Sequence, residues 1–189
     1  MQKIIHGKAF VVGDNVDTDQ IIPAEYLSYD PTDPGERKFF GRYAMSGVPA
    51  GQSGLPSGTV PFVPEGRFEG DFAVIVAGAN FGCGSSREHA ALAIAEAGCR
   101  AVVAESYARI FYRNSINGGY LTPFEAPQRL VEKISTGDEV EIDPARGVLV
   151  DRATGKEYPL ASLGDVAKII EAGGIFAYAR RTGMLAREP

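Results

Sequence analysis

The chain has 189 residues, of which 44% are hydrophobic, and a formal net charge of −5. This length supports one sizeable core, so we expect a single domain over residues 1–189. Lysine and arginine are scattered, and no basic run alternates with aromatic residues, which argues against a nucleic-acid-binding protein. No apolar stretch approaches the roughly 20 residues that span a bilayer, and residues 1–7 lack signal- or transit-peptide character. We therefore expect a cytoplasmic protein without membrane contact.

The first expected strand, Ala9–Val12, is followed by three aspartates. Asp14, Asp17 and Asp19 form a D-x-x-D-x-D pattern that lacks the glycine and the distal glutamate of an EF-hand. We therefore expect turn formation and helix capping from them rather than calcium binding.

Residues 30–70 form an irregular insertion that contains six of the 12 prolines and eight of the 23 glycines. A loop of this length in a compact domain is usually functional or disordered, and a flexible surface insertion is an equally good interpretation. Because Phe39–Gly51 is rich in aromatic and apolar residues, we expect part of it to order on a partner or substrate.

The next elements alternate strand and helix. Strands are expected at Phe72–Ala77, Ala101–Ala104 and Leu121–Phe124, and helices at Glu88–Ala97 and Tyr107–Asn114. Such alternation is typical of parallel βαβ units and predicts an α/β fold.

Beyond Thr136 the pattern changes. Polar and apolar residues alternate around turn signals at Pro144–Gly147 and Thr154–Gly155, which predicts short antiparallel strands. Two closing helices are then expected at Ala161–Ala172 and Ile175–Met184, separated by a glycine pair.

The cysteines and histidines lack the spacing of metal ligands. Cys83 and Cys99 belong to no C-x-x-C motif and are expected to be reduced thiols, with Cys99 a small buried apolar residue. His6 and His89 are isolated and expected to be structural. We predict no metal site in this chain.

The most informative segment is the glycine-rich turn between Phe72–Ala77 and the following helix. Gly78, Gly82 and Gly84 permit positive φ angles and a close backbone approach. The free N–H groups of the first helical turn would then face a cavity that fits a carboxylate or a phosphate.

The polar residues that follow strengthen this interpretation. Ser85 and Ser86 stand where helix N-caps stand, and Glu88 completes a capping-box pattern with Ser85. Arg87 adds a guanidinium suited to bidentate carboxylate recognition. A role confined to capping and turning is the competing interpretation.

Known motifs fit the turn poorly. Arg87 occupies the third glycine position of a G-x-G-x-x-G motif, and no GK[ST] sequence follows, which disfavours nucleotide phosphates. Neither Ser85 nor Ser86 has the flanking glycines of a serine-hydrolase elbow. Acyl transfer by Cys83 stays a weak alternative, because His89 is rotated away on the same helix.

Four ordered segments resemble the small subunits of 3-isopropylmalate dehydratase, the swivel domain of the aconitase superfamily. They are GDNVDTDQIIPAEYL (13–27), GANFGCGSSREHA (78–90), SYARIFYRNSINGG (106–119) and EAGGIFAYAR (171–180), and together they span nearly the whole chain. The resemblance implies the swivelling β/β/α domain of the aconitase C-terminal type. The insertion at about residues 30–70 is similar to that of the plant-type enzymes.

The resemblance implies a hydro-lyase subunit in leucine biosynthesis that interconverts 2-isopropylmalate and 3-isopropylmalate by dehydration and rehydration. It also implies a large-subunit partner with a [4Fe-4S] cluster, and no cofactor in this chain. Ser85 would be the base, with backbone N–H groups around Gly84–Ser86 stabilising its alkoxide. Ser86 and Arg87 would bind a substrate carboxylate.

Residues 26–29 correspond, by the same resemblance, to the loop that reads the variable arm of the substrate, which implies substrate contacts by Ser28 and Tyr29. Homoaconitase-like relatives resemble Y-L-R-T there, and Ser28 replaces their arginine. Without that cation an apolar branch is favoured over a third carboxylate. Arg42 is a further cation without an assigned position. Homoaconitase, dimethylmalate dehydratase and a non-catalytic anion-binding module stay open as alternatives.

Two arginines follow the third expected strand. Arg109 and Arg113 lie four residues apart and therefore share one helix face. We expect mainly structural roles for them, since surface ion pairing or carbonyl capping is the more common use of such arginines.

Overall fold

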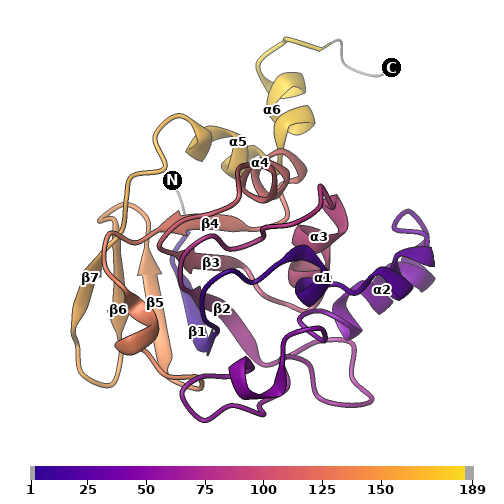
Figure 1. Cartoon of the computed structure of the whole chain (residues 1–189). Coiled ribbons are helices and arrows are strands. Elements are labelled where there is room, and N and C mark those ends of the chain that lie inside the picture. The colour runs from indigo at the N-terminus through magenta and orange to yellow at the C-terminus, as the bar shows by residue number, and fades with distance from the viewer. Residues whose placement is uncertain (1–2, 186–189) are drawn as a thin grey trace.

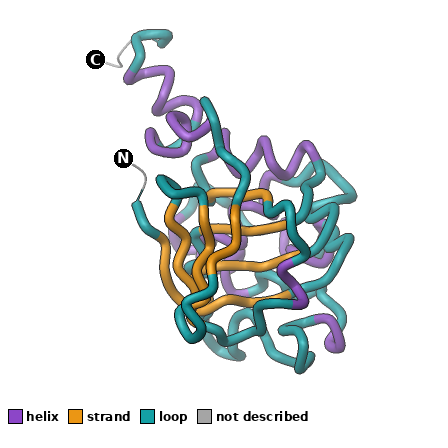
Figure 2. The backbone as a smooth tube through the Cα atoms, turned by 90° about the vertical axis from the view of Figure 1, so that its left-hand side faces the viewer, coloured by secondary structure: helices purple, strands orange, loops and turns teal. Residues whose placement is uncertain are grey.

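The computed structural model describes residues 3–185 (Figure 1). Its strands form one sheet in the order β4-β3-β2-β1-β5-β6-β7, seen as a curved layer in Figure 2. The parallel half contains β1 (Ile5–Val11), β2 (Phe72–Ala77), β3 (Ala101–Ala104) and β4 (Thr122–Glu125). The antiparallel half contains β5 (Glu139–Asp143), β6 (Val148–Asp151) and β7 (Glu157–Pro159). The predicted α/β class is confirmed.

The parallel half follows the apolar runs of the sequence. Strands β2 and β3 have the predicted bounds, whereas β1 begins four residues earlier than expected and β4 is displaced by one residue. Two α-helices, α3 (Glu88–Glu96) and α4 (Arg109–Gly118), connect β2 to β3 and β3 to β4. Continuous apolar strands of this kind are buried on both faces.

The sheet separates two hydrophobic cores. Alternate residues of β1 enter different cores: Phe10 packs with the helices, whereas Ala9 and Val11 pack with the turn at η3 (Leu130–Glu132) and the antiparallel strands. This alternation is the period-2 geometry of a strand.

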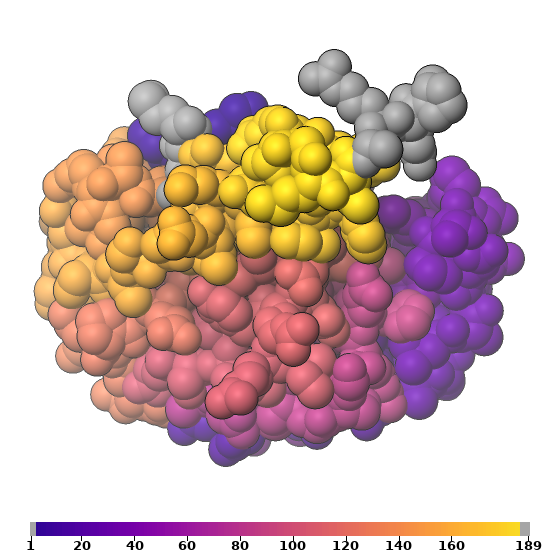
Figure 3. Space-filling view, turned by 90° about the horizontal axis from the view of Figure 1, so that it is seen from above, coloured from indigo at the N-terminus to yellow at the C-terminus, as the bar shows by residue number. Residues whose placement is uncertain are grey.

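The C-terminal region contains two helices that contact α4, α5 (Val166–Ala172) and α6 (Ile175–Arg181), which form the yellow surface in Figure 3. Helix α5 begins five residues later than expected, after Gly164 at φ +56°. The glycine pair ends α5 as predicted, with Gly173 in the left-handed region.

The insertion at residues 30–70 contains helices and packs against other parts of the same chain. It contains α2 (Pro34–Arg42), capped by Asp33, and the short 3-10 helix η2 (Ala50–Gln52). Four apolar residues, Phe40, Ala44, Met45 and Val48, are buried in the core on the helical side of the sheet. The expectations of a flexible loop, or of ordering on a partner or substrate, are therefore wrong for this part, because its apolar residues bury against the chain's own α3.

Close packing of α2 on α3 depends on a glycine. A Cβ atom at Gly41 would overlap the backbone of Glu96 and Phe68. Among the described residues, no helix is long and apolar enough to cross a membrane.

Candidate functional site

The loops that follow β1, β2, β3 and β4 meet at one edge of the sheet, because the carboxyl ends of parallel strands lie together. Backbone hydrogen bonds join them. The amide of Gly82 donates to Val16 O at 2.7 Å, and the amide of Phe81 donates to Ser106 O at 3.0 Å. The glycine-rich turn therefore lies between the loops after β1 and β3.

This turn, residues 78–87, is called the serine loop below. Asn80, Gly82 and Gly84 have φ angles of 59°, 76° and 91°, in the region that favours glycine. A Cβ atom at Gly82 would overlap the buried ring of Phe111. Gly82 and Gly84 therefore have the predicted positive φ angles, whereas Gly78 does not. Gly78 instead allows a close approach, because a Cβ atom there would overlap the Asp14 carboxylate.

Ser85 is exposed at the end of the serine loop, beside a buried threonine. The Thr18 hydroxyl lies 3.1 Å from Ser85 Oγ and can donate to Ser85 O at 3.2 Å, and Thr18 is only 2% exposed. Sequence reasoning did not identify Thr18 as a site residue. The one sequence signal for Thr18 was that it directly follows Asp17, the N-cap residue of the capping box of α1 (Thr18–Ile21). In the structure the Thr18 amide donates a hydrogen bond to Cys83 O at 2.8 Å, which brings the start of α1 against the serine loop.

The predicted capping of α3 by serine is wrong. Its N-cap is Arg87, and no side chain there accepts a capping hydrogen bond. The amide of Arg87 donates to Ser85 O at 2.9 Å, so the chain makes one further turn before the helix begins. Both serines remain exposed, and the first-turn amides of the nine-residue helix lack a side-chain cap. Such a helix start attracts anions.

Arg87 is held against α1. One of its terminal nitrogens, Nη1, pairs with the Asp19 carboxylate and donates to Ile22 O at 3.2 Å. Asp17 caps α1 through the amide of Gln20, so the expected capping role of the aspartates is confirmed there.

Arg129, which sequence reasoning also missed, follows β4 and connects the loops after β1 and β3. Its guanidinium donates to Asp14 at 2.8 and 3.2 Å and to Glu105 at 2.7 Å. Asp14 in turn accepts from the amide of Ala79 at 2.8 Å. The hydrogen bond from Arg129 is the main cause of the lowered pKa of Asp14.

Known proteins resemble the chain over almost its full length. Residues 63–128 match the Aconitase C-terminal domain family. The 3-isopropylmalate dehydratase small subunit 1 of Arabidopsis thaliana is 47% identical over 97% of this chain and 72% of that protein. The small subunit from Aquifex aeolicus is 45% identical over 95% of this chain and 96% of its own length.

A solved structure agrees with these relatives. The crystal structure of a 3-isopropylmalate dehydratase from Methanocaldococcus jannaschii superimposes with a TM-score of 0.75 at 41% identity, covering 96% of each chain. The chain belongs to the 3-isopropylmalate dehydratase small-subunit family. It is therefore a hydro-lyase subunit with the swivel-domain fold, and its relatives' designation implies a large-subunit partner. The relatives' names support this function and not the homoaconitase, dimethylmalate or non-catalytic alternatives.

The loop expected to read the substrate arm lies directly after α1. Residues Ala24–Ser28 form the 3-10 helix η1, with Ser28 exposed and its hydroxyl donating to Glu25 O at 3.4 Å. Tyr29 is half-buried and stacks on Phe39 at 4.7 Å. The guanidinium of Arg42 lies over the Tyr43 ring at 5.8 Å.

The other residues considered from the sequence differ in exposure and packing. Arg109 and Arg113 are exposed on α4, and the His89 ring packs 5.4 Å from that of Phe40. Burial raises the pKa of the Cys99 thiol to about 12 and also raises that of Cys83. A raised thiol pKa disfavours a nucleophilic role for Cys83. No group of three or more metal-ligating side chains occurs within residues 3–185.

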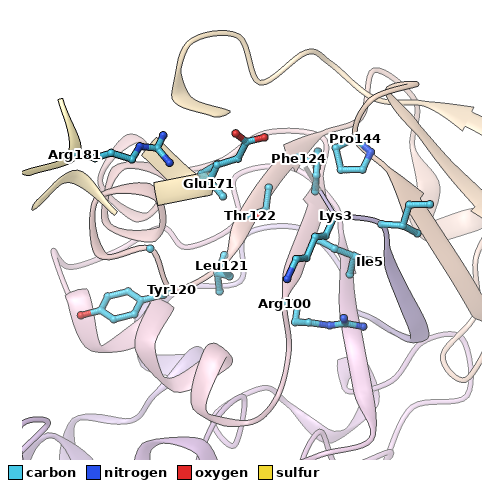
Figure 4. Close-up of a pocket in the computed structure, with 13 residues that line it drawn as sticks. Lys3, Ile5, Arg100, Tyr120, Leu121, Thr122, Phe124, Pro144, Glu171 and Arg181 are labelled. Carbon is cyan, nitrogen blue, oxygen red and sulfur yellow. The ribbon is translucent and has the colours of Figure 1, made fainter. Parts of the chain in front are cut away.

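A cavity of about 580 Å³ lies elsewhere, at the amino ends of β3 and β4. Figure 4 shows Arg100, Thr122 and Glu171 around it. None of the residues predicted from sequence to bind substrate lines this cavity. The serine loop, at the other end of the strands, is therefore the candidate site.

Proposed function

We propose that this chain, together with a large subunit, interconverts 2-isopropylmalate and 3-isopropylmalate by dehydration and rehydration. The observation that carries the proposal is the exposed Ser85 hydroxyl beside Thr18 and in front of the uncapped start of α3. The identity of 41–47% to enzymes of this name supports the choice of substrate.

Ser85 is proposed as the base. As an alkoxide, Ser85 removes the proton from the carbon next to a carboxylate while the hydroxyl on the neighbouring carbon leaves as hydroxide, which takes up a proton to become water, and the alkene forms. In rehydration, water gives up that proton and its hydroxide adds to the carbon that had lost its proton. Ser85 returns its own proton to the carbon that had lost the hydroxyl, which regenerates the alkoxide. A serine is a weak base, so its alkoxide requires stabilisation by donors fixed in advance. The Thr18 hydroxyl and the amides around Gly84–Ser86 supply them, with the helix dipole of α3.

The substrate carboxylates are proposed to contact Ser86 and Arg87. Ser86 is exposed next to the base, and the guanidinium of Arg87 is held in place by its ion pair with Asp19. A guanidinium held by an ion pair loses little conformational entropy when it binds a carboxylate. Ser28, exposed on η1, would face the uncharged arm of the substrate.

The described residues of this chain do not fit an iron–sulfur cluster, because they contain no suitable group of ligands. We propose that a [4Fe-4S] cluster belongs to the large subunit. When bound there, it would supply a Lewis acid for the leaving hydroxyl. Ser85, Ser86 and Arg87 would contribute proton transfer and substrate positioning alone.

The test is Ser85→Ala in the reconstituted two-chain enzyme. Loss of the base should lower kcat for 3-isopropylmalate at least about 100-fold while the complex still assembles. Ser162→Ala is the matched control, because Ser162 is an exposed serine in the segment between β7 and α5. Near-normal turnover by an assembled Ser85→Ala complex would refute the proposed role of Ser85.

A further inference from the structure

An aromatic stack joins the insertion to the loop beside the serine site. The rings of Tyr26 and Tyr43 lie 3.7 Å apart with an interplanar angle of 3°. The Tyr29 ring is within 9° of parallel to Tyr43 and stacks 4.7 Å from Phe39. Two rings of the segment 24–29 are thus fixed by two rings from α2 and its C-cap.

Backbone contacts extend this support to α1. The Met45 amide donates to Ile21 O at 2.6 Å, and the Gly47 amide donates to Gln20 O at 3.0 Å. Gly47 has no space for a side chain, since a Cβ atom there would meet the backbone of Asp19 and Gln20. Residues 43–47 therefore lie directly behind the helix that carries Thr18 and Asp19.

The supported segment borders the reacting groups. Arg87 donates to Ile22 O, two residues before η1 begins at Ala24. Within η1 and at its end, the tyrosine rings turn inward and are half-buried, whereas Glu25 and Ser28 are exposed. Because the stacked rings of Tyr26 and Tyr29 face the insertion, Glu25 and Ser28 of segment 24–29 face outward.

We propose that Tyr43 is a positioning residue for substrate specificity, because its ring holds Ala24–Tyr29 so that this segment contacts the branched arm of the substrate. This inference rests on the proposed function and assigns the insertion a role in it. The segment is stacked in advance, so binding the arm requires little further ordering. Without the ring, Tyr26 and Tyr29 lose their common partner and the segment moves away from the arm.

The experiment uses the reconstituted two-chain enzyme with Tyr43→Ala and Tyr43→Phe. The measured quantities are kcat and KM for 3-isopropylmalate and the inhibition constant of malate, which has the two carboxylates but no isopropyl arm. Tyr43→Ala should raise KM roughly ten-fold while the malate constant and kcat change less than about two-fold. Tyr43→Phe keeps the ring and should retain the wild-type KM.

Phe68→Ala is the matched control. Phe68 belongs to the same insertion and contacts Phe39 edge-on at 5.4 Å, but it stacks on neither Tyr26 nor Tyr29. It should leave KM unchanged. If Tyr43→Ala fails to assemble, Phe39→Ala, which removes the partner of Tyr29, should give the same selective rise in KM.

The outcomes separate this inference from the proposed function. A wild-type complex that does not convert isopropylmalate refutes the proposed function and this inference with it. An active wild type combined with an unchanged KM in Tyr43→Ala refutes this inference alone. Equal weakening of isopropylmalate and malate also refutes it, because a merely structural ring would affect both ligands.

Discussion

The antiparallel half of the sheet closes its turns locally, whereas the parallel half does not. In the turn between β5 and β6, Asp143 accepts hydrogen bonds from the amides of Ala145 and Arg146. In the serine loop, by contrast, Asn80 pairs with Asn15 across 65 positions, and Ser85 lies beside Thr18 across 67. The hairpin turns need only their own residues, whereas the candidate site requires distant segments to be in place.

The largest effect on stability is expected at Gly82, which can be compared with Gly155, a glycine of similar φ. Gly82 (φ +76°) lies against Phe111, whereas Gly155 (φ +72°), in the turn between β6 and β7, has open space around it. Gly82→Ala should lower the free energy of unfolding by about 3 kcal/mol, through strain and overpacking. Gly155→Ala should cost about 1 kcal/mol, from strain alone. Urea unfolding of the full chain followed by circular dichroism measures both, and equal losses would contradict the comparison.

A smaller effect is expected from two ion-paired arginines. Arg129 joins the loops after β1, β3 and β4, whereas Arg146 pairs with Glu157 on the neighbouring strand of one hairpin. Arg129→Ala should lower the free energy of unfolding by about 1 kcal/mol and also reduce kcat of the two-chain enzyme, because the serine loop loses its support. Arg146→Ala should leave kcat and the urea midpoint nearly unchanged. A wild-type kcat in Arg129→Ala would show that the loops hold their positions without it.

The smallest effect concerns acid pH. The pKa of Asp14 lies below its ordinary value of 3.8, chiefly because of Arg129, and the pKa of Asp151 is lowered chiefly by the Thr154 hydroxyl. A carboxyl group whose pKa is lower in the folded than in the unfolded chain stabilises the fold at pH values above its unfolded-state pKa. This contribution is lost as the pH falls through the folded-state pKa. Asp14→Asn and Asp151→Asn should each reduce the loss of stability between about pH 6 and about pH 3.

Salt distinguishes the two aspartates. Added salt should shrink the Asp14 effect, because the Asp14–Arg129 pair is partly exposed, and should leave the Asp151 effect in place. Urea midpoints at the two pH values, in low and high salt, provide the measurement. An Asp14 contribution that does not respond to salt would contradict the role of Arg129.

Sequence reasoning succeeded where the signal is local. The bounds of β2 and β3, the turns at Pro144–Gly147 and Thr154–Gly155 and the glycine stop after α5 were all predicted from adjacent residues. It failed for the insertion, because the proline and glycine content hid the apolar residues of α2 that bury against α3.

The candidate site was predictable in part. The positive φ angles of Gly82 and Gly84 and the anion-attracting helix start followed from residues 78–90 alone. The exposure of the two serines did not, because their position predicted N-caps. Thr18 and Arg129 did not, because their roles depend on partners 67 and 115 positions away. Helix capping was misassigned because a serine near a helix start resembles a cap whether or not its hydroxyl has another partner.

The bare amino end of α3 has one last consequence. Peptide amides carry no proton that titrates while the protein stays folded, so the attraction of this helix start for a carboxylate does not depend on pH. The affinity of this helix start for a carboxylate of a dicarboxylic acid should consequently be the same at neutral and at alkaline pH. Any fall in rate on the alkaline side would then have its cause outside this helix start.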